Sequence, residues 1–313
     1  MNKFPLPSNY KVLPNSIDFN LSGFEKSCIE ISTLSVDDVK CEQLYEEFVA
    51  RIDKALLGQF LPIVRLCDGE YIFIVGRNYG SLRLNRISRW VLNIKETTKI
   101  ILKFNFKSAG GDLYKSGNYN ILEREDALIK YLENLKWVSI HGILAMHFSW
   151  GKIPFTEGLW PYVKSIFDYN SIQITRQNYF PFYFVYAYLA SSDSNNLFEN
   201  KRMLVINSAE GDKKQSIIES LFKRNVKSVD WIAISVDRSM YDIIKIEKFI
   251  NTIDVVLIGA GVGKLNIIRQ LENLKVPCID IGYYMEILAD SSNKYKRTMC
   301  CTDTELEKHN GIN

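Results

Sequence analysis

Two acidic side chains flank a glycine directly after a short apolar run in the first quarter of the chain. Residues 64–70 read V-R-L-C-D-G-E, so that Asp68 and Glu70 are the two acids. Ligands of open parallel sheets bind beyond the carboxyl ends of strands, which is where these carboxylates would lie. Carboxylate oxygens suit a hard cation such as Mg²⁺ or Mn²⁺, which would in turn neutralise the oxygens of a diphosphate. The segment therefore predicts a metal and diphosphate site.

The neighbours of the two acids fit the same chemistry. Gly69 would allow an unusual backbone angle or the close approach of a ligand. Arg65 could present its planar guanidinium to a phosphate group. The alternative interpretation is an ordinary Asp-Gly turn with a glutamate in the first turn of a helix.

A glycine-rich turn near the end of the chain is the second candidate site. Residues 259–264 read G-A-G-V-G-K after an apolar run, and Gly259 and Gly261 would seat a phosphate beside a helix N-terminus. The third glycine comes too early for a dinucleotide-binding motif, and the leading glycine of a Walker loop is missing. Asp280 falls at the end of the next predicted strand, where a ribose-binding acid is expected. The alternative is tight packing of strand and helix, with Asp280 capping a turn.

Three segments resemble one family. R-L-C-D-G-E (65–70) is similar to the R-x-G-D-G-E-F signature of the GT-D-type glycosyltransferases, a family first described as a domain of unknown function. V-V-L-I-G-A-G (255–261) and the later C-I-D-I-G (278–282) resemble its closing strands, and I-T-R-Q-N-Y (174–179) resembles its central S-R-x-Y region. The segments follow the family's order. The chain departs from the pattern in having Cys67 for a glycine and Tyr283 for a histidine, and 77–160 has no match.

The resemblance implies a single-domain, metal-dependent hexosyltransferase. It implies Mn²⁺ or Mg²⁺, a nucleotide-diphosphate sugar donor, typically UDP-glucose, and a glycan, glycoprotein or lipid-linked acceptor in surface polysaccharide or glycoprotein assembly. It assigns metal and donor binding to Asp68 and Glu70, which are also the residues we expect to act in catalysis. Arg176 matches the central arginine near the phosphates, and Asp280 and Gly282 match the late D-I-G.

Two other functions stay open. A nicotinamide-dependent oxidoreductase would use 259–264 and Asp280 and would need no metal. A nucleotide-binding protein without catalytic activity would bind the same ligands without turnover. Within the transferase interpretation, either carboxylate of the acidic pair could bind the metal or deprotonate the acceptor.

The order of the predicted strands and helices that carry these residues indicates an α/β fold. In the last third, apolar strands alternate with helices, and this alternation predicts parallel βαβ units. The strands are apolar throughout, as in a sheet covered on both faces. We therefore expect a Rossmann-like, mostly parallel sheet with helices on both faces. The predicted strands are 202–207, 229–234, 254–261 and 276–282, and the predicted helices are 212–224, 239–251 and 263–274.

The earlier part of the chain gives weaker signals. An apolar position every fourth residue predicts a helix from 36 to 56. The other predicted helices are the one that opens after Gly69, 125–135, 162–167 and the run after Pro181, and the predicted strands are 61–66, 137–144 and 171–176. We expect an N-terminal arm over 1–35, one domain over 36–290 and a polar tail over 291–313.

Composition limits the classes of partner. The 313 residues are 47% hydrophobic and 24% charged with a net charge of +3, which is ordinary for a globular enzyme. No block of Lys and Arg predicts a nucleic-acid partner. No apolar run is long enough to span a membrane and no secretory signal is recognisable, so a cytoplasmic protein is expected. Its six cysteines contain no C-x-x-C pair, which argues against zinc.

Overall fold

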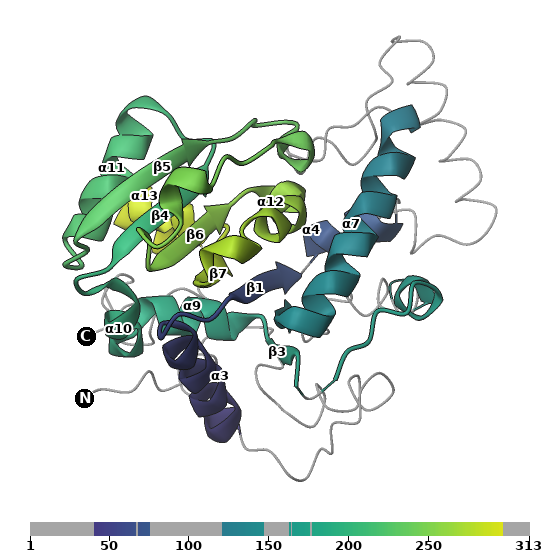
Figure 1. Cartoon of the computed structure of the whole chain (residues 1–313), viewed down its shortest axis with the longest axis horizontal. Helices are drawn as coiled ribbons and strands as arrows, with labels where there is room; N and C mark the ends of the chain where they lie inside the picture. The colour runs from purple at the N-terminus through teal and green to yellow at the C-terminus, as the bar shows by residue number, and fades with distance from the viewer. Residues whose placement is uncertain are drawn as a thin grey trace.

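Seven parallel strands form one sheet in the order β3-β2-β1-β7-β6-β4-β5 (Figure 1). The computed structural model describes residues 41–66, 68–75, 121–146, 163, 165–175 and 177–296. The strands are β1 (Leu61–Leu66), β2 (Ile143–Met146), β3 (Tyr179–Pro181), β4 (Arg202–Asn207), β5 (Ser228–Ala233), β6 (Val255–Gly259) and β7 (Pro277–Asp280). Every described strand pair is parallel, which confirms the predicted Rossmann-like α/β class.

Helices cover both faces of the sheet (Figure 1). One face carries α4 (Asp68–Val75), α7 (Ile121–His141) and α12 (Lys264–Gln270). The other carries α3 (Cys41–Ala55), α9 (Tyr183–Ala190), α10 (Asn195–Phe198), α11 (Gly211–Phe222) and α13 (Tyr284–Ala289). Among the described helices, none is long and apolar enough to cross a lipid bilayer.

The apolar strands supply both cores at once. In β1, Val64 and Leu66 belong to the core under α7 and α12, whereas Leu61 and Ile63 belong to the opposite core. Successive side chains of a strand point to opposite faces, so a strand covered on both faces is apolar at nearly every position. In β1 the exception is Arg65. The edge strand β5 is less buried, and its Asp230 is exposed.

The first described helix follows the predicted spacing. Leu44, Phe48 and Ile52 of α3 are buried on one stripe. The chain then turns at Gly58, whose φ of +98° is a left-handed conformation that favours glycine. The next residues enter β1.

The predicted strand over 137–144 is wrong for most of its length. Helix α7 continues to His141, and β2 begins only at Ile143. Short apolar runs do not separate a strand from the buried end of a helix. The two elements join at Gly142, where a Cβ atom would lie 2.2 Å from the carbonyl oxygen of Pro62.

Two further predicted elements are replaced. Residues 171–175 contain no strand, and the edge strand β3 follows them instead. The predicted helix over 239–251 is reduced to two short 3₁₀ turns, Ser239–Tyr241 and Glu247–Phe249. Between them the backbone NH of Ile244 donates to the side chain of Gln270, 2.9 Å away, and not to a helical carbonyl.

The remaining predicted elements of the last third are confirmed, and α13 is an addition to them. The predicted arm over 1–35 lies outside the described residues. The tail is described only as far as residue 296, in a 3₁₀ turn over Ser291–Lys296.

Candidate functional site

The sheet has a topological switch point between its neighbouring strands β1 and β7. After β1 the chain continues into α4 on one face, and after β7 it continues into α13 on the opposite face. In open α/β sheets, ligands bind beyond the carboxyl ends of the strands at such a divergence. Arg65 near the end of β1 and Asp280 at the end of β7 lie at this edge.

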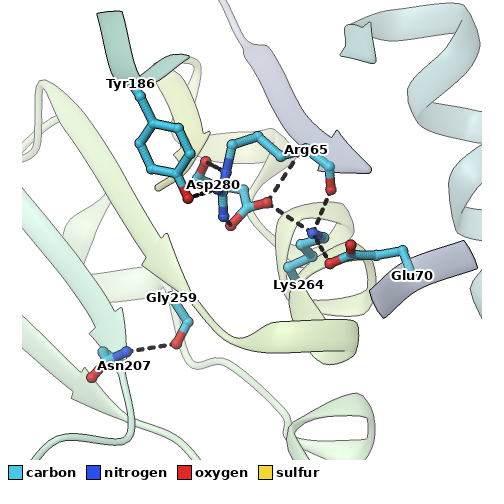
Figure 2. A network of polar contacts seen from close by, with 7 residues as sticks. All are labelled: Arg65, Glu70, Tyr186, Asn207, Gly259, Lys264 and Asp280. Atoms are coloured by element: carbon cyan, nitrogen blue, oxygen red, sulfur yellow. Dashed lines mark hydrogen bonds and ion pairs between the residues drawn. The ribbon is translucent and has the colours of Figure 1, made fainter. Parts of the chain in front are cut away.

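Four charged side chains form a buried network at this position (Figure 2). The ammonium of Lys264 lies 2.5 Å from Oε1 of Glu70 and 2.9 Å from Oδ2 of Asp280. Nη2 of Arg65 lies 3.2 Å from Oδ1 of Asp280. All four residues are less than 10% exposed. The network joins β1, α4, α12 and β7. It therefore links residues 65–70 to residues 264–280, which are far apart in the sequence.

Asp280 is the centre of this network. Its Oδ1 binds the guanidinium of Arg65, and its Oδ2 binds Lys264 and the backbone NH of Arg65. Burial alone would raise the pKa of Asp280, but Arg65 and Lys264 outweigh burial and the pKa is lowered. The side chain is therefore an ion-paired carboxylate at neutral pH.

Lys264 is charged for the reciprocal reason. Burial alone would lower the pKa of its ammonium, but the nearby Asp280 and Glu70 outweigh burial and the pKa is raised. The ammonium also donates to the carbonyl oxygen of Arg65. A buried ammonium needs such partners, because an unpaired buried charge is strongly destabilising.

The guanidinium of Arg65 is held on several sides. Nε donates to the carbonyl oxygen of Asp280 at 2.8 Å, and Nη1 donates to the hydroxyl of Tyr186. The charge also lies 4.9 Å from the ring centroid of Tyr186 and 5.3 Å from that of Phe182, both within cation–π range. Gly282 faces the guanidinium from β7's end, and its φ of +41° is left-handed.

A second polar contact lies at the carboxyl ends of the neighbouring strands β4 and β6. The side-chain amide of Asn207 donates to the carbonyl of Gly259 at 2.6 Å (Figure 2). A Cβ atom on Gly259 would lie 2.7 Å from both Asn207 and Met285, so a larger residue has no room. Close packing against β4 and α13 accounts for a glycine at position 259.

Comparison with family models, with curated proteins and with solved structures finds no match for this chain.

The structure brings together part of the predicted site. Arg65, Glu70, Asp280 and Gly282 meet at one edge of the sheet. Asp68 and Gly69 begin α4 beside them.

The rest of the predicted site is placed elsewhere or is not described. Gly261 adopts a φ of +52° in the 3₁₀ turn (Gly261–Gly263) before α12. The side chain of Asp68 and the whole of Arg176 lie outside the described residues.

Two residues of the network were not predicted. Lys264 had no predicted role, because 259–264 does not match a Walker loop, but it is buried at the first position of α12. Tyr186 lies in the predicted helix after Pro181, where it is buried in the core and its hydroxyl accepts from Arg65. The available signal for Lys264 was its place as the first residue of the helix that follows the glycine-rich turn.

The ammonium of Lys264 lies beside both described carboxylates of this network. No group of three or more His, Cys, Asp and Glu side chains is gathered in the described part of the chain. Between Glu70 and Asp280, the position suited to a cation is taken by the ammonium of Lys264. A divalent ion at this edge therefore needs other ligands.

Proposed function

We propose that the protein is a metal-dependent glycosyltransferase that takes a hexose from a nucleotide-diphosphate sugar, with UDP-glucose as the first donor to test. The observation that carries the proposal is the contact between Glu70 and Lys264, which are 194 positions apart. It unites the acidic turn with the glycine-rich segment, and these are two of the segments that resemble the GT-D-type family. Asp280, from the late D-I-G segment, lies in the same network.

The location supports the proposal independently. The acidic turn follows β1 and the glycine-rich segment follows β6, so both lie at the carboxyl ends of central strands, on either side of β7. The acceptor in this proposal is a glycan, a glycoprotein or a lipid-linked sugar. A divalent cation, when bound, would neutralise the charge that develops on the departing diphosphate.

The geometry favours a transferase over a nicotinamide-dependent oxidoreductase. That function would use Asp280 to accept the hydroxyls of a ribose. Both carboxylate oxygens of Asp280 are instead engaged by Arg65 and Lys264, and the side chain is only 1% exposed.

The first experiment is a thermal-unfolding screen of the full chain with UDP, GDP and NAD, each with and without Mn²⁺. A ligand at a hundred times its Kd stabilises the native state by about 2.7 kcal/mol. We expect stabilisation by UDP that requires Mn²⁺. Stabilisation by NAD alone would show that the oxidoreductase is the correct function.

The second experiment separates an enzyme from a binding protein. We expect hydrolysis or transfer of UDP-glucose by the unmodified chain and its loss in Asp68→Asn. Asp212→Asn is the matched control, because Asp212 is an exposed acid in the first turn of α11, another helix that follows a central strand. Binding of UDP without any turnover of UDP-sugars would reduce the function to nucleotide binding.

A further inference from the structure

The ammonium of Lys264 lies in an oxygen-lined position of the kind that proteins offer to metal cations. Its neighbours are a carboxylate oxygen of Glu70 at 2.5 Å, a carboxylate oxygen of Asp280 at 2.9 Å and the carbonyl oxygen of Arg65. Carboxylate and backbone carbonyl oxygens are the usual ligands of hard cations. The three oxygens come from α4, β7 and β1, so the ammonium closes the edge where these elements meet (Figure 2).

The charge balance of the network also indicates that this position holds one positive charge. Arg65 and Lys264 carry the positive charges of the network, and Glu70 and Asp280 carry the negative ones, so these four residues sum to zero. A divalent ion added between the two carboxylates would meet the ammonium at close range and leave positive charge uncompensated in a buried place. The position therefore suits a single fixed charge.

We propose that Lys264 is an internal cation occupying the place of a metal ion between Glu70 and Asp280, and that Glu70 is a positioning residue for the acidic turn. The Glu70–Lys264 ion pair fixes the first turn of α4 against the first turn of α12. Resting on the proposed function, this assignment leaves Asp68 as the residue of the acidic turn that binds the divalent ion.

The test of the internal cation needs no nucleotide. In Lys264→Ala the oxygens of Glu70 and Asp280 are left without the ammonium, so Mn²⁺ should bind in its place. We expect MnCl₂ to raise the unfolding temperature of Lys264→Ala by about 3 °C or more, and to leave that of the unmodified chain unchanged. Adding Glu70→Gln to Lys264→Ala should abolish the gain.

Lys213→Ala is the matched control for that experiment. Lys213 also forms an ion pair, with Glu286 at 2.5 Å, but both side chains of this pair are more than 40% exposed. Its loss should create no manganese-dependent stabilisation. An absence of that stabilisation in Lys264→Ala as well would refute the internal cation.

Should Lys264→Ala fail to fold, Glu70→Gln decides the question. Loss of a partner outside the metal's own ligands weakens metal binding by about 10-fold to 100-fold. In the presence of UDP, we expect the Kd for Mn²⁺ to rise by about 10-fold to 100-fold in Glu70→Gln and by more than about 100-fold in Asp68→Asn. Equal losses in the two variants would make Glu70 a metal ligand and overturn the proposal.

The two proposals fail in different ways. If the unmodified chain binds no Mn²⁺ in the presence of UDP, the transferase and the assignment of the metal to Asp68 both fall. The nucleotide-free measurement on Lys264→Ala still decides whether Lys264 replaces a cation.

Discussion

A Cβ atom on Gly282 would lie 1.6 Å from Nη2 of Arg65, so the guanidinium fills the space that any side chain at position 282 would need. Gly282→Ala must therefore push Arg65 away from Asp280, and it must also hold an alanine at a φ of +41°. We expect the free energy of unfolding to fall by about 3–5 kcal/mol, because a buried ion pair is broken and backbone strain is added. Urea unfolding measures the loss.

Gly211→Ala separates the two causes. Gly211 has a similar φ of +52°, but nothing lies within 4 Å of a Cβ atom built there. Only the backbone strain remains, about 1–2 kcal/mol. Equal losses in the two variants would mean that Arg65 yields without cost.

The side chain of Asn178 holds the segment that leads into β3, so its truncation should destabilise the protein. Its Oδ1 accepts from the backbone NH of Thr175 at 2.8 Å, and its Nδ2 donates to the carbonyls of Ser139 and Gln173 at 2.7 and 2.8 Å. Asn178→Ala should lower the free energy of unfolding by about 2–4 kcal/mol, because several buried polar groups lose their partner. Asn196→Ala, at an exposed position, should cost little in the same chemical denaturation experiment.

The ion pair between Arg202 and Asp254 predicts a pH dependence of stability. Hydrogen bonds from Arg202, at 2.6 and 3.0 Å, lower the pKa of Asp254 below its ordinary value. A carboxylate with a lowered pKa in the folded state stabilises the protein above its unfolded pKa of about 3.9, and this stability is lost as the pH falls through the folded value.

Asp254→Asn should therefore lose stability at neutral pH and show a weaker acid dependence below about pH 4. Urea midpoints measured between about pH 3 and about pH 6 test this. Asp230→Asn, at an exposed position of the neighbouring strand β5, makes the same change of charge and is the control. An acid dependence of Asp254→Asn that matches the unmodified chain would contradict the prediction.

The strands of the last third were predictable from the sequence because a sheet covered on both faces demands continuous apolar runs, which glycines and short helices separate. The failures have a different origin. Over 239–251 the predicted helix does not form, because Gln270 of α12 bonds the backbone there. Its side chain accepts from the backbone NH of Ile244 and donates to the carbonyl of Asp242. A hydrogen bond between distant segments leaves no trace in local periodicity.

The candidate site shows the same division. Arg65, Glu70 and Asp280 were predicted as site residues from their positions at strand ends, and the structure brings them together. The pairing inside the site was not predictable. The role of Lys264 is visible only in the folded protein, where its ammonium contacts the carboxylates of Glu70 and Asp280, which are far apart in the sequence.

Arg65→Lys distinguishes a structural guanidinium from one that is kept for the donor's phosphates. The guanidinium bonds the carbonyl and carboxylate of Asp280 and lies within cation–π distance of Phe182 and Tyr186. A lysine has neither the planar fork nor the stacking surface. We therefore expect Arg65→Lys to lower the free energy of unfolding by about 2–4 kcal/mol.

Tyr186→Phe, which removes only the hydroxyl, should cost about 1 kcal/mol. Arg51→Lys is the control, because Arg51 lies over the ring of Phe180 outside the network. Urea unfolding and the Kd for UDP with Mn²⁺ are measured on the same samples. A variant Arg65→Lys with unchanged stability but a weakened Kd would return Arg65 to the phosphate-binding role that its position in the sequence predicts, because the guanidinium would then hold the ligand and not the fold.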